Sequence, residues 1–384
     1  MVDINQLFFE LIQVAIGTRI CLSHTPSVDE WGELYAMAKK QSLVGVCFAG
    51  MQRLQTQRQQ PPEMLYLTWM GMTAKIQQRN EVVNRQCVEL QAKLAADGFR
   101  NYIMKGQGNS VLYRTSCEND NENLCLLRQC GDIDVYLEGG LDKVLAYART
   151  FGEVKKVNEL EIHVDVFPDT EVEFHYMPFF MRSPIRNKRL QAFFESKKED
   201  CFENKIALQN GVGEIVSPTI EFNLVHQLVH IYHHFITEGV GLRQLMDYYM
   251  VLRTVENSKE GIEEVRRAVH ELGLDCFASA LMWVIKTVFI GHPSTGSGQA
   301  DNNDNFFPWT PNEKDGRLLL DEVIKSGNFG HMDETKANLS NKWSSFWYVN
   351  GKTFRFWRFD HWAWFWSPLW RIYHFAWRKV NGYK

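Results

Sequence analysis

The spacing of hydrophobic residues changes twice along this chain. From the N-terminus to Gly98, apolar residues recur every three or four positions, a spacing typical of amphipathic helices. Between residues 99 and 178 they alternate with polar residues in short runs, which predicts β-strands. The helical spacing returns at Pro218 and continues to about Gly291. These changes predict an α+β protein in which a small mixed sheet is preceded and followed by helices.

Two of the N-terminal helices have clear boundary signals. Ser27 followed by Glu30 has the spacing of a capping box, in which each side chain accepts a hydrogen bond from the other residue's backbone amide. A long helix is predicted between the Pro61-Pro62 pair and Gly98, because proline favours the first turn of a helix and glycine ends helices. We therefore expect residues 1–98 to form an N-terminal helical region.

Four segments of residues 99–178 are predicted to be strands. In chain order they read "RNYIMKG", "GDIDVYL", "ELEIHVDVF" and "TEVEFHYMP". The first two are separated by a glycine-containing turn and a helical segment, and the Pro168-Asp169 pair between the last two predicts a hairpin. The region is therefore expected to form a compact α/β unit.

The rest of the chain divides by composition. Residues 179–291 are expected to form a helical domain. Residues 292–304, "HPSTGSGQADNND", have the composition of a flexible linker. Residues 305–384 are expected to form a C-terminal helical region that ends in an aromatic and basic tail.

The overall composition argues against several classes of protein. A formal net charge of −4 gives no general attraction to nucleic acid. The N-terminus has acidic residues where a signal peptide would have basic ones. The sequence contains no run of 18 apolar residues, so it predicts no membrane span. Eight cysteines are scattered without a C-x-x-C pair, which argues for reduced thiols. We therefore expect a cytoplasmic protein.

Two aspartates interrupt an otherwise apolar strand. Asp132 and Asp134 are expected to point to the same face, roughly 6.5–7 Å apart along the strand, while Ile133 and Val135 point into the core. Paired carboxylates repel each other unless a cation lies between them, and Mg²⁺ prefers carboxylate and phosphate oxygens. A surface strand with two aspartates on its polar face is the alternative. The glycine turn before the pair and the acidic strand after it favour a metal site.

These segments together resemble nucleotidyltransferases of the polymerase-β type. In that pattern a strand ends at a glycine-containing turn and a helix, a second strand carries D-x-D, and a later strand provides a third carboxylate. The chain is most similar to a largely uncharacterised bacterial nucleotidyltransferase-like family, which implies a polymerase-β-like core. The matching segments are "MKGQGNSVLY" (104–113), Arg128 with "CGDIDVYL", "VEFHYMP" (172–178), "EGVGLRQLMD" (238–247) and "SGNFG" (326–330).

The resemblance implies a role for each matching residue. Asp132 and Asp134 would hold Mg²⁺ with a third carboxylate, for which Glu173 is favoured over Asp165 by its place in the motif. The third residue would also accept the proton of the acceptor hydroxyl. The turn and nearby polar or basic residues would bind the nucleotide phosphates: Lys105, Gly106, Gln107, Gly108, Ser110 and Arg128.

The activity implied by the resemblance is transfer of an NMP from an NTP to a hydroxyl acceptor, with two Mg²⁺ ions. The acceptor would be a sugar, another small metabolite or a protein side chain. The chain departs from the superfamily pattern at Gln107 and in an acidic insertion, "SCENDNENLC" (116–125), which would repel a triphosphate if it folded over the site. A nucleotide-binding or regulatory protein without turnover is therefore the alternative.

Two features of the second helical region have both a structural and a functional interpretation. His226, His230 and His234 share one helix face at metal-ligand spacing, but the segment contains no Glu or Cys, so packing against the sheet is favoured. Arg243 is four residues before Asp247, which suits an ion pair within the helix. In two-domain nucleotidyltransferases the helical domain lines the cleft, so Arg243 is equally suited to bind the nucleotide or acceptor.

The C-terminal tail has an unusual composition. Residues 342–384 contain 17 aromatic residues, and eight lysines and arginines against one acid, Asp360. Ser367 and Pro368 have the order of a helix N-cap and first residue. We expect these rings mainly to pack on the helical domains. A basic, tryptophan-rich helix also suits a membrane surface or a protein partner.

Overall fold

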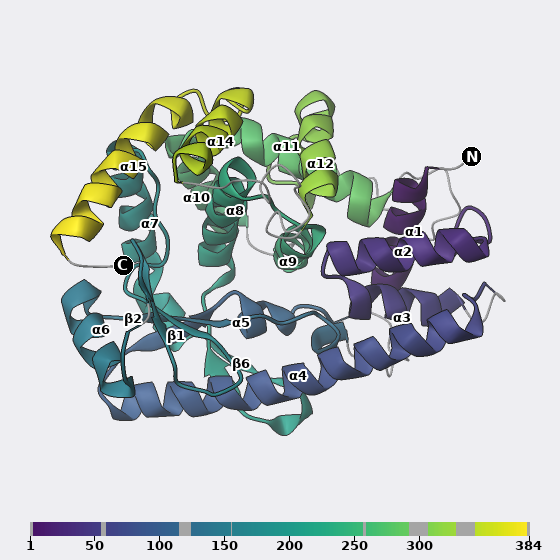
Figure 1. Cartoon of the computed structure of the whole chain (residues 1–384), viewed down its shortest axis with the longest axis horizontal. Helices are drawn as coiled ribbons and strands as arrows, with labels where there is room; N and C mark the ends of the chain where they lie inside the picture. Colours follow the sequence, from purple (N-terminus) through teal and green to yellow (C-terminus); the bar gives the residue numbers. More distant parts are fainter. Residues whose placement is uncertain are drawn as a thin grey trace.

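The computed structural model is a mostly helical α+β protein built around a five-stranded mixed sheet (Figure 1), as the sequence predicted. It describes residues 3–54, 59–114, 124–154, 156–255, 259–291, 306–327 and 342–381. The expected linker (292–304), most of the acidic insertion (116–125) and the last three residues of "SGNFG" lie outside the described residues.

Four helices precede the sheet. They are α1 (Ile4–Ile16), α2 (Val28–Lys40), α3 (Val44–Leu54) and α4 (Glu63–Ala96). The capping box of α2 is confirmed, since Ser27 Oγ accepts from the Glu30 amide at 3.3 Å and Glu30 Oε2 accepts from the Ser27 amide at 2.7 Å. The long helix α4 follows Pro62 and runs beneath both the N-terminal helices and the sheet (Figure 1).

The sheet has the strand order β1-β2-β5-β4-β3. Its strands are β1 (Asn101–Met104), β2 (Ile133–Leu137), β3 (Lys156–Val157), β4 (Glu161–Val164) and β5 (Val172–His175). β2 and β5 are parallel, and the other neighbouring pairs are antiparallel. The hairpin predicted at Pro168-Asp169 is confirmed as the connection between β4 and β5. Short helices in the other connections are α5 (Gly106–Ser110), η2 (Leu124–Leu126), α6 (Gly140–Ala148) and η3 (Arg149–Phe151).

The two faces of the sheet have different neighbours. One face buries alternate strand residues in a core with α4 and α6: Ile133, Val135, Leu137, Ile162, Val172 and Phe174. At the other face, Tyr102 packs on Phe202 of α7 (Pro184–Glu203) and Phe222 of α8 (Ile220–Thr237), with ring centroids 5.4 and 5.7 Å apart. These rings cover only part of the second face, and the polar side chains of β2, β4 and β5 on that face border a cavity.

The second helical region contains one feature that the sequence analysis missed. Helices α8, α9 (Leu242–Leu252), α10 (Lys259–Glu271) and α11 (Asp275–Ile285) follow the predicted spacing, and α11 continues into a π-helical turn, η5 (Lys286–Ile290). A small antiparallel hairpin precedes them, formed by β6 (Lys205–Ala207), η4 (Gln209–Gly211) and β7 (Glu214–Val216). The helix predicted at "DGRLLLDEVIKSG" is confirmed as α12 (Glu313–Ser326). No helix in the described segments has the length and apolar character that a bilayer crossing requires.

The tail forms helices α14 (Lys342–Arg355) and α15 (Ala363–Val380). The predicted start of α15 at Ser367-Pro368 is wrong. The helix begins earlier because Asp360, held by Arg186 at 2.6 Å, accepts the Trp362 amide at 2.9 Å. Buried rings such as Phe356 and Phe359 pack on the helical domain as expected. Others are exposed: Trp347, Phe354, Trp357, Trp362, Trp364, Phe365, Tyr373 and Phe375.

Gly50 allows helix α3 to lie close to α1, because a Cβ at this position would be 2.5 Å from the Leu11 carbonyl oxygen and 3.1 Å from the Ala15 Cβ. We expect Gly50→Ala to lower the free energy of unfolding by about 1–3 kcal/mol, despite the higher helix propensity of alanine. Gly71→Ala in α4 should raise it by up to about 1 kcal/mol, because a Cβ there meets nothing within 4 Å. Urea unfolding measures both changes, and equal effects of the two substitutions would contradict the close contact.

Candidate active site

The polar face of β2, β4 and β5 carries acidic and imidazole side chains. Strand alternation places Asp134 and Glu173 opposite the apolar core, as predicted, and also places His175 there. The register sets Asp134 beside Glu173, and Glu173 beside His163 of β4. In the next row His175 lies beside Glu161. Five side chains that ligate metals in many proteins therefore share one small surface.

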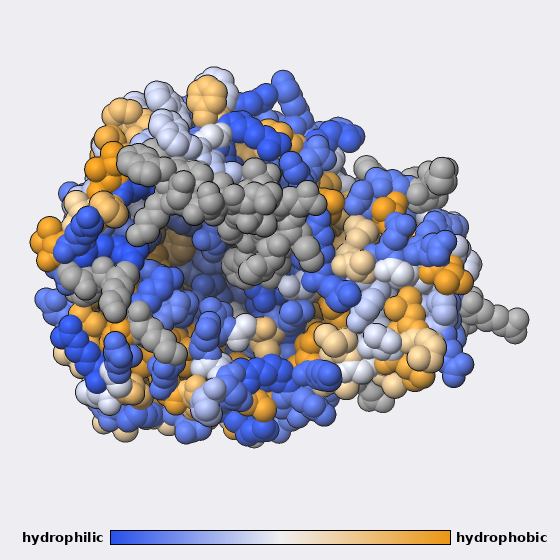
Figure 2. All heavy atoms as spheres, in the orientation of Figure 1, coloured by the Kyte–Doolittle hydropathy of each residue, from blue (hydrophilic) through white to orange (hydrophobic). Residues whose placement is uncertain are grey.

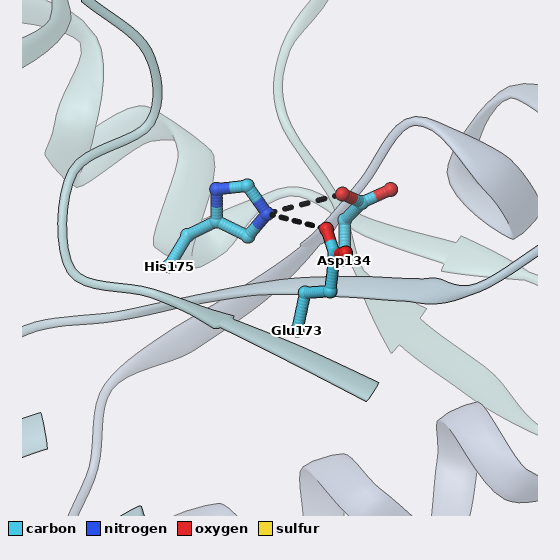
Figure 3. A group of neighbouring side chains, drawn as sticks. All are labelled: Asp134, Glu173 and His175. Atoms are coloured by element: carbon cyan, nitrogen blue, oxygen red, sulfur yellow. Dashed lines mark hydrogen bonds and ion pairs between the residues drawn. The ribbon is translucent and has the colours of Figure 1, made fainter. Parts of the chain in front are cut away.

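His175 lies beside both Asp134 and Glu173 (Figure 3). Its Nε2 lies 3.0 Å from Asp134 Oδ1 and 3.6 Å from Glu173 Oε2. Lys105, at the end of β1, brings its ammonium group to 2.8 Å from the same Asp134 oxygen and 3.3 Å from His230 Nε2. Two side chains, Lys105 and His175, therefore stabilise the negative charge of Asp134.

These contacts shift the pKa values of the cluster. Burial would lower the pKa of His175, but its hydrogen bond to Asp134 and the nearby carboxylate of Glu173 raise it to about 9. Burial raises the pKa of Glu173 to about 7, and repulsion from Asp134 adds to this effect. Burial would also raise the pKa of Asp134, but Lys105 and His175 hold it below its usual value. At neutral pH Asp134 is therefore ionised and His175 is protonated.

Four residues of the cluster, Asp134, Glu161, Glu173 and His175, line a cavity of about 320 Å³ between the sheet and helices α8 and α9. Figure 2 shows a hollow near the centre of the face in view, and the residues coloured by hydropathy along its wall are mainly hydrophilic. The acidic residues of the lining are Asp132, Asp134, Glu159, Glu161, Glu173, Glu238 and Asp247, and the positively charged ones are Lys105, Arg128, Lys156, Arg243 and the protonated His175. Because acids outnumber bases, an anionic substrate needs additional positive charge to bind here.

The structure brings the predicted metal-binding residues together at this cavity. Asp132, Asp134 and Glu173 all line it. Asp132 precedes β2 and is exposed, and repulsion from Asp134 raises its pKa. Asp165, the alternative third carboxylate, follows β4, is exposed and is not among the described lining residues. The geometry therefore favours Glu173 over Asp165.

The predicted phosphate-binding turn is directed only partly at the cavity. Lys105 and Gly106 line it, and their φ angles are +47° and +34°. Such an angle is strained for lysine, and strained backbone is characteristic of functional sites. The surrounding fold therefore holds Lys105 in an unfavourable conformation that brings its ammonium group to Asp134.

The other residues of the turn face the interior. Gln107 is buried and donates a hydrogen bond to Asn84 of α4. Ser110 is buried and donates to the Gln107 carbonyl oxygen at 2.9 Å. Gly108 allows close approach of the Ser217 hydroxyl. None of these three residues is among the described lining residues, so their predicted contact with phosphate has no support from the geometry.

The two predicted arginines line the cavity but have different partners. Arg128 forms a buried bidentate pair with Asp247, 2.7 Å from each carboxylate oxygen, and the Tyr113 hydroxyl donates to the same carboxylate at 2.6 Å. Asp247 therefore serves mainly to hold Arg128 rather than to pair within its own helix. Arg243 donates to the Gln129 carbonyl oxygen at 3.0 Å and faces the cavity, as its functional interpretation requires.

Among the histidines of α8, His226 has the packing role that the sequence favoured, whereas His230 and His234 also line the cavity. His226 Nε2 lies 3.3 Å from the Pro178 carbonyl oxygen, and the rings of His230 and His234 are 4.3 Å apart. Burial lowers the pKa of His226 to about 3, so this imidazole is neutral. The groups of described residues that are suited to a metal ion lie on the sheet, not on α8.

Glu161, His163 and His175 were overlooked at the sequence level. The ligand atoms of Asp134, Glu173 and His175 lie within 4.8 Å of one another, as do those of Glu161, His163 and Glu173. The available signal was the repeated E-x-H of "EIH" and "EFH" on two strands predicted to form a hairpin. Carboxylates and imidazoles both ligate divalent ions, so these residues fit a metal site.

Removal of Asp247 would leave the Arg128 guanidinium buried without a counter-charge. We expect Asp247→Ala to lower the free energy of unfolding by about 3–5 kcal/mol in urea titrations. The double variant Arg128→Met, Asp247→Leu should recover most of this loss, since it removes both charges. A loss below about 1 kcal/mol in Asp247→Ala would contradict a buried pair.

The raised pKa of His175 predicts how stability depends on pH in protein freed of metal by a chelator. Protonation of His175 stabilises the folded state fully below about pH 6.5, and this stabilisation is lost as pH rises to about 9. We expect the free energy of unfolding to fall over this range by an amount on the order of 2–3 kcal/mol. His175→Gln should flatten the slope. His226→Gln, which removes an imidazole already neutral in this range, should keep it, and an unchanged slope in His175→Gln would contradict the assignment.

Comparison with known proteins agrees with this geometry. The profile of an uncharacterised nucleotidyltransferase family matches residues 27–289, which include the sheet, the cavity and helices α8 to α11. None of the curated proteins compared with the chain matches it. Because the match covers more than half of the sequence, the chain belongs to this family of uncharacterised nucleotidyltransferases.

Proposed function

We propose that the protein is a metal-dependent nucleotidyltransferase, which moves an NMP from an NTP to a hydroxyl acceptor and releases pyrophosphate. One observation carries the proposal: Asp134 and Glu173 lie side by side on parallel strands, in a cavity that also contains Lys105 and Arg243. Family membership supports the reaction class, and it implies a polymerase-β-type core for residues 99–178.

In this proposal Asp132, Asp134 and Glu173 hold divalent cations against the triphosphate, two Mg²⁺ being the ions expected for the family. Such ions, when bound, stabilise the charge on the attacking and leaving oxygens. Lys105 and Arg243 add positive charge, and the planar guanidinium of Arg243 suits two phosphate oxygens. The acidic surplus of the cavity supports a requirement for cations, because it would otherwise repel an NTP.

The acceptor is proposed to be a hydroxylated small molecule, a sugar or a protein side chain. Phe179 and Phe180 form an apolar part of the cavity wall. Such a surface suits the flat face of a nucleobase or sugar, whereas the carboxylates suit phosphates only through bound cations. The cavity therefore has separate polar and apolar parts for the two ends of a nucleotide.

Nucleotide binding without turnover is the second candidate. It is favoured by the contacts of Asp134, whose Oδ1 is already 2.8 Å from Lys105 and 3.0 Å from His175, so its charge is balanced without an ion. Both candidates require NTP binding in the cavity. Only the first requires pyrophosphate release when acceptors are supplied, and a pyrophosphate assay therefore separates them.

Calorimetric titration of the four NTPs, with and without divalent cation, tests the shared requirement. We expect at least one NTP to bind in a metal-dependent way, and affinity to fall by at least about tenfold, or about 1.4 kcal/mol, in the double variant Asp132→Asn, Asp134→Asn and in Arg243→Gln. Asp165→Asn, a charge change outside the cavity, is the matched control and should bind normally. Failure of every NTP to bind the wild type would contradict the proposal.

A further inference from the structure

Two Glu-x-His sequences face each other on the paired strands β4 and β5. One is residues 161–163 and the other is residues 173–175. Their antiparallel register sets Glu161 opposite His175 and His163 opposite Glu173. Each glutamate therefore lies beside both histidines, in an arrangement with approximate twofold symmetry.

Each glutamate directs one carboxylate oxygen to each imidazole. Glu161 Oε1 is 3.4 Å from His163 Nε2, and its Oε2 is 3.6 Å from His175 Nε2. Glu173 Oε1 is 3.5 Å from His163 Nε2, and its Oε2 is 3.6 Å from His175 Nε2. These distances exceed the roughly 2.7–2.9 Å of charge-assisted hydrogen bonds. They match the separation between two ligand atoms that each lie about 2.0–2.2 Å from the same ion.

Part of this arrangement is buried and has no short hydrogen bond, although Asn158 donates to Glu161 at 2.8 Å and His175 lies 3.0 Å from Asp134. Glu173 is 9% exposed, and the nearest cationic groups to its two oxygens among the described residues are these imidazoles at 3.5 and 3.6 Å. His163 Nε2 is buried and has no hydrogen-bond partner in the described part of the chain. An unsatisfied buried polar atom is costly, and one that lies beside the oxygens of two carboxylates fits a site for a cation.

We propose that the cluster is a paired cation site in which Glu161 and Glu173 bridge two first-row divalent ions such as Mn²⁺. His163 is a further ligand of one ion, and His175 and Asp134 are further ligands of the other. Bridged ions of this kind lie about 3.5–4 Å apart, the spacing of two-metal phosphoryl-transfer sites. The inference rests on the proposed function. It places the ions over β4 and β5, whereas the two aspartates alone would place them at the start of β2.

The imidazoles determine which ions fit. Mg²⁺ is usually bound by one or two carboxylates together with water and substrate phosphates. Imidazole nitrogen suits iron, zinc and related first-row ions, whereas carboxylate oxygen suits Mn²⁺ as well as Mg²⁺. A ligand set with one imidazole and at least two carboxylates per ion therefore favours a first-row ion over Mg²⁺. His163 and His175 are the selective ligands.

Binding of Mn²⁺ to the metal-free, full-length protein tests the paired site, with equilibrium dialysis for the stoichiometry and electron paramagnetic resonance for free Mn²⁺. We expect about two Mn²⁺ per chain in the wild type and in the control Asp165→Asn, and about one in His163→Gln. Glu173→Gln should lower the affinity for both ions by at least about tenfold, because it removes a ligand that the two ions share. A tenfold excess of Mg²⁺ should leave the bound Mn²⁺ in place.

One Mn²⁺ per chain in the wild type would overturn the proposal, as would displacement of Mn²⁺ by equimolar Mg²⁺. Retention of two ions in His163→Gln would also overturn it. Glu161→Gln gives the same readout if circular dichroism shows that His163→Gln does not fold.

NTP binding in the same samples separates the two proposals. Nucleotide binding with a single ion overturns only the paired site, whereas two ions without nucleotide binding overturn only the proposed function.

Discussion

A buried carboxylate is stable only where cations or hydrogen-bond donors surround it. Asp134 meets this requirement through Lys105 at 2.8 Å and His175 at 3.0 Å. The β1–α5 turn holds Lys105 at a positive φ angle, and the parallel pairing of β2 with β5 brings His175 to the same oxygen. The neutral His230 of α8 completes the contact on the helical side. The turn, the strand order and the position of α8 are therefore all linked to the charge of one side chain.

Local patterns in the sequence were sufficient for features that depend on a few neighbouring residues. Strand alternation predicted that Asp134 lies on the face opposite the buried Ile133 and Val135, and end signals predicted the boundaries of α4. Patterns of this kind contain no information about strand register or distant partners. The pairing of Arg128 with Asp247, the inward direction of Gln107, and the apposition of the two Glu-x-His sequences all depend on such contacts. The β6–β7 hairpin was missed because three-residue strands are too short to show an alternation.

The cavity combines elements from distant parts of the chain. The sheet provides the carboxylates, and α9 provides Arg243. The C-terminal tail, which lies beyond the family match, contacts two residues that line the cavity. Trp370 of α15 stacks on Phe180 with ring centroids 4.9 Å apart, and His374 lies 3.1 Å from Glu159. Both partners line the cavity, so α15 supports its rim while its outer rings remain exposed. Residues outside the part shared with the family therefore help to hold two residues of the cavity wall in place.

In the proposed function, the carboxylates of β2 and β5 hold a cation against a nucleotide phosphate. A crystal structure of the protein with Mn²⁺ and a non-hydrolysable NTP analogue tests it most directly, because anomalous scattering locates the ion. We predict an Mn²⁺ ion bound at about 2.0–2.2 Å by oxygens of Asp134 and Glu173, and in contact with a phosphate oxygen. Nucleotide bound in the cavity with its phosphates away from these carboxylates, or bound elsewhere on the protein, would contradict the claim.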